Sequence, residues 1–284
     1  MKTLLSIDGG GLFGIGVANW LPKLAGNWKF DCYAGTSVGS ILAACYAIGM
    51  SPKEVQELFN SKLPEKIFTK EGGIKGAVKL ASYKTGPARD ALAGVFGDMK
   101  VSKVKNPLVI VAWNYNKNKE KVFSQTSNGS YLLRDAVLAS MSAPTYFRPL
   151  KLKDEDGKEE QLGDGGVCGN DPSLAGITEL LKAKKADIKE VKCLSISTGG
   201  EPKEKSIKIS SIKDWIPILT DAVTLGNVGY TSYCVRHILG DRYLRISPKD
   251  LPSGSMDNFK LVPKIKEAWL KHPEKEALSF LKKK

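Results

Sequence analysis

Histidine and paired cysteine are scarce in this chain. Its 284 residues include only two histidines, His237 and His272, so a serine–histidine–aspartate triad has few candidates for its central base. The five cysteines are odd in number and scattered, with no CxxC pair among them. Such a set predicts neither a disulfide framework nor a zinc site, and it indicates reduced thiols, no bound metal and a cytoplasmic setting.

Long hydrophobic runs are also missing. The longest apolar stretch, residues 38–48, is too short to cross a bilayer and is interrupted by Gly39 and Ser40. Near the start of the chain, the apolar residues after Lys2 end at Asp8, which does not fit a secretory signal peptide. We therefore expect a cytoplasmic protein that is either soluble or peripheral at a membrane surface.

Negative charge is in short supply, and the net charge is +13. Segments 51–106 and 201–284 carry net charges of +5 and +6, whereas segments 1–50 and 107–200 carry only +1 each. Basic segments suit an anionic partner such as an anionic membrane surface, although a lysine-rich solvated surface explains them equally well. The sequence contains no known nucleic-acid module and no basic stripe interleaved with aromatic residues, so no nucleic-acid partner is expected. The oligomeric state is not predicted.

A glycine-rich loop follows the first predicted strand. Residues 4–7 are apolar, and the chain then reads Asp8-Gly9-Gly10-Gly11-Leu12-Phe13-Gly14. Backbone N–H groups around the three consecutive glycines can stabilise the oxyanion of a tetrahedral intermediate. The loop also satisfies the GxGxxG pattern of dinucleotide sites, which requires an acidic residue at the end of the second strand. Asp31 stands instead at the beginning of that strand, so a nucleotide site is disfavoured.

A serine stands at a predicted strand-to-helix turn. Residues 30–34 are typical of a strand, Gly35-Thr36-Ser37-Val38-Gly39 follows, and residues 38–48 are typical of a buried helix. This is the geometry of a nucleophile elbow, with Ser37 at its apex. The flanking glycines permit a tight turn and a close approach of helix to sheet. The helix N-terminus favours negative charge, and the Val38 N–H can contribute to the oxyanion site.

A third glycine-rich element, Asp164-Gly165-Gly166, supplies a carboxylate. The chain order Ser37, Asp164, His237 formally fits an α/β-hydrolase triad. However, the serine follows the second strand rather than a longer sheet, and His237 lies in a helix-like stretch without a catalytic motif. The favoured hypothesis is a Ser37–Asp164 dyad, in which the glycines let the carboxylate approach the serine hydroxyl. Together the three elements point to a serine acyl hydrolase.

These motifs resemble those of the patatin-like phospholipase family over roughly residues 3–200. The resemblance rests on five ordered segments: Asp8–Gly11, Ala34–Gly39, Ser142–Phe147, Asp164–Pro172 and Leu194–Gly199. It implies an α/β, three-layer α/β/α fold with a mainly parallel central sheet. It also implies hydrolysis of phospholipid or other acyl-ester lipids without a metal or other cofactor. The site positions that the resemblance assigns are the nucleophile Ser37, the base Asp164, the oxyanion-hole residues Gly9, Gly10, Gly11 and Val38, and the motif residues Asp8, Gly14, Gly35, Gly39, Gly165 and Gly166.

One position departs from the family pattern. Phe13 stands where the family usually carries a basic residue. The oxyanion donors are backbone groups, so the hole is expected to survive, but any help that a cation gives to an anion or headgroup is lost. Phe13 is interpreted as an apolar plug or as part of the acyl-chain wall. Two alternatives to a hydrolase remain, namely an acyltransferase with the same dyad and a non-catalytic lipid-binding module.

The remaining segments predict the overall organisation. Residues 1–200 form the catalytic core, and residues 201–284 form a basic extension packed on the same domain. Within that extension, apolar residues repeat at helical spacing beside lysines, which suits either a membrane-interface helix or an ordinary packed helix. These apolar residues are Leu261, Ile265, Ala268 and Trp269. Short helices and loops over 62–106 are expected to cover the site. Other helices are expected over 14–24, 52–61, 132–141 and 172–184, and other strands over 108–112, 121–124 and 191–197. A polar hairpin is expected over 151–160, leading to residues 161–164.

Overall fold

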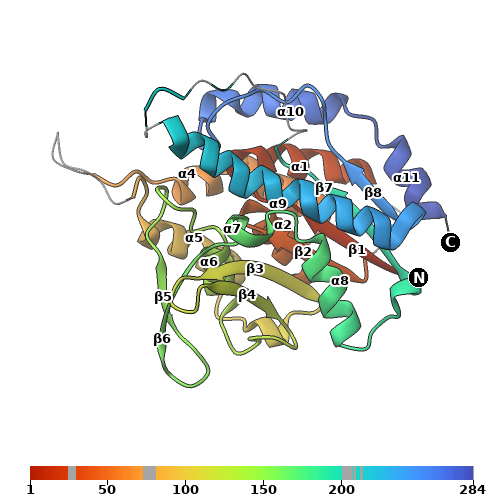
Figure 1. Ribbon diagram of the computed structural model, residues 1–284, viewed down its shortest axis with the longest axis horizontal. Helices are drawn as coiled ribbons and strands as arrows, with labels where there is room; N and C mark the ends of the chain where they lie inside the picture. Colours follow the sequence, from red (N-terminus) through yellow and green to blue (C-terminus); the bar gives the residue numbers. More distant parts are fainter. Residues whose placement is uncertain (25–29, 73–80, 200–206, 208, 212–213, 284) are drawn as a thin grey trace.

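A central sheet with helices on both faces forms the body of the protein (Figure 1). The computed structural model describes residues 1–284 except for 25–29, 73–80, 200–206, 208, 212–213 and 284. Both termini lie on the same side of the molecule in Figure 1. The α/β fold class and its three α/β/α layers are as the sequence predicts.

Within the described residues the sheet has eight strands, in the order β5-β6-β3-β2-β1-β7-β8, with β4 also paired to β3. The strands are β1 (Lys2–Ile7), β2 (Cys32–Thr36), β3 (Leu108–Asn114), β4 (Lys119–Ser124), β5 (Leu150–Lys153), β6 (Glu159–Asp164), β7 (Val191–Ile196) and β8 (Tyr243–Ile246). The five neighbouring strands β3, β2, β1, β7 and β8 pair in parallel, whereas the pairs β3–β4, β3–β6 and β5–β6 are antiparallel. Because parallel strands end at the same edge of a sheet, the loops after β1, β2 and β7 converge there.

The helices form the two outer layers. They are α1 (Gly14–Trp20), α2 (Val38–Ile48), α3 (Pro52–Asn60), α4 (Leu63–Ile67), α5 (Thr85–Phe96), α6 (Leu133–Ser140), α7 (Gly166–Gly169), α8 (Ser173–Lys182), α9 (Trp215–Leu239), α10 (Val262–Lys271) and α11 (Lys275–Lys282). Helices α2 and α6 belong to the larger buried cluster on one face of the sheet. On the other face, Ile177 and Leu180 of α8 and Val235 and Leu239 of α9 form a separate buried cluster against the strands.

Several local elements follow directly from their residues. The helix predicted over 38–48 is α2, and the capping box at the start of α3 has both of its hydrogen bonds, between Ser51 and Glu54. The helix predicted over 14–24 is α1 followed by a 3-10 turn at Leu21–Leu24. Pro22 has no N–H to continue the α-helical ladder, which explains the change.

Helix α10 is a packed helix, and the interpretation as a membrane-interface helix is wrong. Its Ile265 and Trp269 side chains are fully buried. Trp269 packs against α1, where its ring centroid lies 5.4 Å from that of Trp20. A Cβ on Gly16 would lie only 2.0 Å from the Trp269 Cδ1 atom, so the ring occupies the space that a larger residue at Gly16 would need. The apolar spacing read from the sequence therefore describes a core-facing stripe, and the lysines form the opposite, solvated face.

Residues 62–106 contain α4, α5 and connecting turns, as the composition indicates, although the stretch 73–80 lies outside the described residues. None of the helices in the described part of the chain is long and apolar enough to span a membrane.

Candidate active site

The glycine loop after β1 is held in place from both sides. The Gly9 N–H donates to the Asn170 backbone oxygen at 3.1 Å, and the Gly9 oxygen accepts from the Thr198 hydroxyl. Further along, the Leu12 N–H donates to the Met256 oxygen at 2.7 Å. Within the described residues, the N–H groups of Gly10 and Gly11 make no such bond to another segment. Gly10 and Gly11 therefore keep backbone donors for an added group.

Ser37 occupies a strained backbone conformation between β2 and α2. Its φ is 52° and its ψ is −125°, a region that side-chain-bearing residues rarely adopt. The turn is fixed by the Ser37 N–H, which donates to Ser140 Oγ at 2.9 Å, and by the Ser37 oxygen, which accepts from the Ser40 N–H and hydroxyl. A Cβ on Gly9 would lie 3.0 Å from the Ser37 Cβ, so the glycine loop and the serine are adjacent.

The remaining motif glycines explain how these elements come so close. A Cβ would lie only 2.1 to 2.5 Å from a neighbouring atom at Gly14, Gly35, Gly39 and Gly165. At Gly39, for example, that neighbour is the Ile7 oxygen, so α2 packs directly on the end of β1. Residues larger than glycine would push the serine turn away from the glycine loop.

Asp164 ends β6 and reaches the serine turn. It pairs with Ala112 of β3, is 5% exposed, and its Oδ1 accepts from the Gly166 N–H at 2.7 Å. Burial raises the pKa of the Asp164 carboxyl to about 6, while hydrogen bonds from the Gly166 N–H and the Ser37 side chain act in the opposite direction. The structure therefore brings Ser37 and Asp164 together, with a carboxyl poised to gain or lose a proton near neutral pH.

His237 is not brought to this site. It is exposed near the end of α9, where its Nδ1 lies 2.8 Å from the Tyr233 oxygen and its ring lies 4.3 Å from the Tyr233 ring. The second histidine, His272, packs beside Trp20 and Trp269. The contacts of both histidines favour structural positions over a catalytic one.

An apolar pocket with a cavity volume of about 40 Å³ lies beside the serine. Ser37 and Val38 lie at its lining together with residues from α3, α4 and the segment after α6. Its apolar lining includes Leu12, Ile15, Ile41, Phe59, Leu63, Ile67, Phe68, Met141, Phe147 and Met256. Phe13 is not among the lining residues; it is buried in the core, which favours the apolar plug over the acyl-chain wall.

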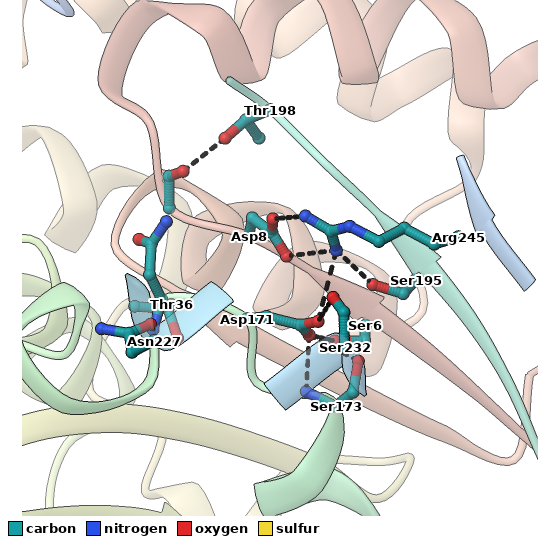
Figure 2. A network of polar contacts seen from close by, with 12 residues as sticks. Ser6, Asp8, Thr36, Asp171, Ser173, Ser195, Thr198, Asn227, Ser232 and Arg245 are labelled. Carbon is teal, nitrogen blue, oxygen red and sulfur yellow. Dashed lines mark hydrogen bonds and ion pairs between the residues drawn. The ribbon is translucent and has the colours of Figure 1, made fainter. Parts of the chain in front are cut away.

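The sequence analysis missed a buried ion-pair network behind the glycine loop (Figure 2). Arg245 on β8 donates to both Asp8 oxygens, to Asp171 Oδ2 at 3.3 Å and to Ser195 Oγ at 2.7 Å. Asp171 also accepts from Ser6, Ser173 and Ser232. Burial alone lowers the pKa of the Arg245 guanidinium, but the charges of Asp8 and Asp171 outweigh that effect and raise it.

This network ties together two loops of the site. Asp8 immediately precedes the glycine loop, and Asp171 immediately follows Asn170, whose backbone oxygen holds Gly9. The available signal was the pair of acidic residues within otherwise apolar motifs, since a buried carboxylate requires a partner. No sequence pattern, however, identifies that partner as Arg245. No group of three or more His, Cys, Asp or Glu side chains is placed to hold a metal ion among the residues that the structure describes.

The sequence of this chain matches the model of a known protein family. The model of the Patatin family, described as patatin-like phospholipase, matches residues 5–176. That match covers more than half of the chain, so the protein belongs to the patatin-like phospholipase family, a family of hydrolases.

Individual proteins of known sequence that resemble this chain share less than a third of its residues. The cGAMP-activated phospholipase of Escherichia coli (strain TW11681) is 29% identical over 239 residues, which cover 75% of this chain and 66% of that protein. Patatin-like protein 2 of Arabidopsis thaliana is 28% identical over 261 residues, covering 76% of this chain and 64% of that protein. The crystal structure of VipD from Legionella pneumophila shares the fold, with a TM-score of 0.50, 14% identity, and coverage of 99% of this chain and 66% of VipD. The chain thus spans about two thirds of the length of the curated relatives that it matches.

Proposed function

We propose that this protein is a lipid acyl hydrolase of the phospholipase A or lysophospholipase type, cleaving carboxylic esters with a Ser37–Asp164 dyad. The observation that carries the proposal is the approach of the Ser37 side chain to the buried Asp164 carboxyl, beside an apolar pocket. The strained backbone of Ser37 exposes its hydroxyl to that pocket. The pocket suits a fatty-acyl chain, since each methylene group buried contributes about 0.8 kcal/mol.

In the proposed first half-reaction, Asp164 accepts the Ser37 hydroxyl proton while Ser37 Oγ attacks the ester carbonyl carbon. The N–H groups of Gly10, Gly11 and Val38 stabilise the oxyanion; the Gly9 N–H already donates to Asn170 and holds the loop. The carbonyl re-forms as the alcohol leaves with the proton from Asp164. In the second half-reaction, Asp164 takes a proton from water, which attacks the carbonyl carbon of the acyl-enzyme. The bond from that carbon to Ser37 Oγ then breaks, Asp164 returns the proton to Oγ, and the fatty acid is released.

The reaction type is tested by fatty-acid release from mixed phospholipid vesicles in the presence of EDTA. We expect free fatty acid to form and EDTA to have no effect, because the dyad uses only side-chain and backbone groups. Transfer of the acyl group to an added alcohol or thiol, in place of free fatty acid, indicates the acyltransferase alternative. A protein that binds vesicles but releases and transfers no acyl group, including in the presence of cGAMP, is the lipid-binding module. The cGAMP arm is included because relatives are described as cGAMP-activated phospholipases.

The pKa of Asp164 predicts the pH dependence of hydrolysis. A general base must be deprotonated, and the pKa of this carboxyl is raised to about 6. We expect kcat/KM on a soluble short-chain ester to be level above that pH and to fall about tenfold per pH unit below it. A profile that stays level down to pH values near the ordinary aspartate pKa of about 4 contradicts the assignment of Asp164 as the base.

We also propose that the protein acts as a cytoplasmic enzyme at an anionic membrane surface. The support is the lysine excess of segments 51–106 and 201–284. Each lysine close to an anionic leaflet contributes about 1 kcal/mol, so binding to anionic vesicles should exceed binding to neutral vesicles at low salt. The difference is measured by vesicle sedimentation. Equal binding to phosphatidylcholine and phosphatidylglycerol vesicles at low salt contradicts an electrostatic contribution.

A further inference from the structure

Over residues 215–233, the described part of the outer face of helix α9 is uncharged, whereas Arg236 is exposed beyond it. Every residue of α9 that is exposed between positions 215 and 233 is uncharged, among the residues whose side chains the structure describes. These residues are Trp215, Leu219, Ala222, Val223, Gly226, Gly229, Tyr230 and Tyr233. Their spacing of three and four residues places them on one side of the helix. Tyr230 and Tyr233 are the most open, at 70% and 62% exposed.

The opposite side of α9 is also apolar, but it is buried. Val228, Val235 and Leu239 are buried there, the last two against the sheet. A helix on the surface of a globular protein normally carries charge on its outer side. Helix α10 of this chain does so, since its exposed side presents Lys264 and Glu267. The outer face of α9 is therefore not the ordinary solvated side of a surface helix.

The same helix contacts the proposed active site. Asn227 Nδ2 donates to the Gly166 oxygen at 2.9 Å, and Asn227 Oδ1 accepts from the Asn170 N–H at 2.9 Å. Gly166 holds the Asp164 carboxylate, and Asn170 holds Gly9. One side of α9 thus fixes the loops around the dyad while the other faces outward. Figure 1 shows α9 crossing the molecule in front of the sheet, close to α7.

We propose that the outer face of α9, from Trp215 to Tyr233, docks on a lipid surface. This inference rests on the proposed function, because the bilayer would contain the acyl-ester lipid that the proposed hydrolase cleaves. Tryptophan and tyrosine, with their apolar rings and polar tips, favour the membrane–water interface, and this face presents Trp215, Tyr230 and Tyr233 around an aliphatic centre. At the C-terminal end of this face the exposed Arg236 adds a cation that complements anionic headgroups.

The salt dependence of vesicle binding distinguishes docking through this uncharged face from docking through lysines alone. Lysine contacts weaken with salt because the Debye length falls to about 3 Å at about 1 M salt, whereas burial of apolar side chains does not weaken. We therefore expect binding to vesicles of pure phosphatidylcholine to persist at about 1 M sodium chloride. That residual binding is the contribution of α9.

The test compares the full-length protein with the triple variant Leu219→Ser, Tyr230→Ser, Tyr233→Ser by sedimentation with phosphatidylcholine vesicles at high salt. The matched control is Leu270→Ser, which removes a leucine that is 48% exposed on α10. We expect the triple variant to bind vesicles at least about tenfold more weakly than wild type, a loss of about 1.4 kcal/mol of binding free energy. The control should bind as wild type. Turnover of a soluble short-chain ester should be the same in all three proteins, since the changed side chains lie outside the pocket.

Three outcomes overturn the inference. The first is a wild-type protein that does not bind these vesicles. The second is a triple variant that binds these vesicles as strongly as the Leu270→Ser control does. The third is a wild-type dimer that the triple variant converts to monomer without change in vesicle binding, which assigns the face to a second copy of the chain. Failure of the proposed function looks different: vesicle binding depends on α9, but no ester is cleaved.

Discussion

Replacing Ser37 by alanine or Asp164 by asparagine is expected to lower fatty-acid release by about 10⁴-fold or more, because the proposed mechanism makes the two groups one catalytic unit. Without the hydroxyl there is no acyl-enzyme, and without the carboxylate the hydroxyl keeps its proton. His237→Ala is the matched control and should retain wild-type activity, since the histidine contacts Tyr233 of its own helix. The measurement is fatty-acid release from mixed phospholipid vesicles at neutral pH.

The variants also separate lost chemistry from lost folding. Because burial raises the pKa of Asp164 to about 6, the folded state binds its proton more tightly than the unfolded state. The stability that this proton contributes is present at low pH and is lost as the pH rises through about 6. Asp164→Asn removes the buried charge and should raise the free energy of unfolding at neutral pH, on the order of 2 kcal/mol. Equal loss of activity in His237→Ala restores the triad hypothesis, and full activity in Asp164→Asn removes the dyad.

Replacing Arg245 by methionine is expected to lower the free energy of unfolding by about 3–5 kcal/mol, which is typical when one partner of a buried ion pair is removed. The Arg245 side chain is 9% exposed, and its loss removes the guanidinium that pairs with the buried Asp8 and Asp171. Lysine at this position keeps the charge but cannot donate to both Asp8 oxygens, so Arg245→Lys should fall between methionine and wild type. Urea denaturation measures the three proteins.

Two further variants are controls for the stability measurement on Arg245→Met. Lys271→Met breaks the exposed pair of Lys271 with Glu267 on α10 and should cost no more than about 1 kcal/mol. Adding Asp8→Asn to Arg245→Met removes one of the two carboxylates that Arg245 neutralises and should recover part of the lost stability. If Arg245→Met costs no more than Lys271→Met, the network contributes nothing beyond a surface pair.

Local elements of the fold are predictable from the sequence because their causes are local. The apolar run over 38–48 forms α2, and Ser51 with Glu54 caps α3 as its spacing indicates. The glycines around Ser37 likewise identify the tight turn, since the close approaches that require them occur within the motif or next to it. The proximity of Ser37 and Asp164 follows from the ends of β2 and β6 meeting near β3.

Long-range partners are not predictable in the same way. Arg245 lies 237 positions after Asp8, and only the pairing of β7 with β8 brings it behind the glycine loop. The pocket is assembled from α1, α2, α3, α4 and the turn around Met256, each of which alone shows only an apolar stripe. For α10, periodicity identified the apolar side but not its neighbour, which is α1 rather than a membrane.

The position of Arg245 also has a consequence for synthesis of the protein. Ribosomes make the chain from its N-terminus, so all the motif residues of the dyad and the glycine loop emerge before β8 does. A nascent chain that ends before residue 245 has two acidic side chains at the centre of its site and no guanidinium to neutralise them. It also lacks the Trp269 ring that fills the space over Gly16. We therefore expect the proposed hydrolase activity to arise late in translation, only after β8 has been synthesised.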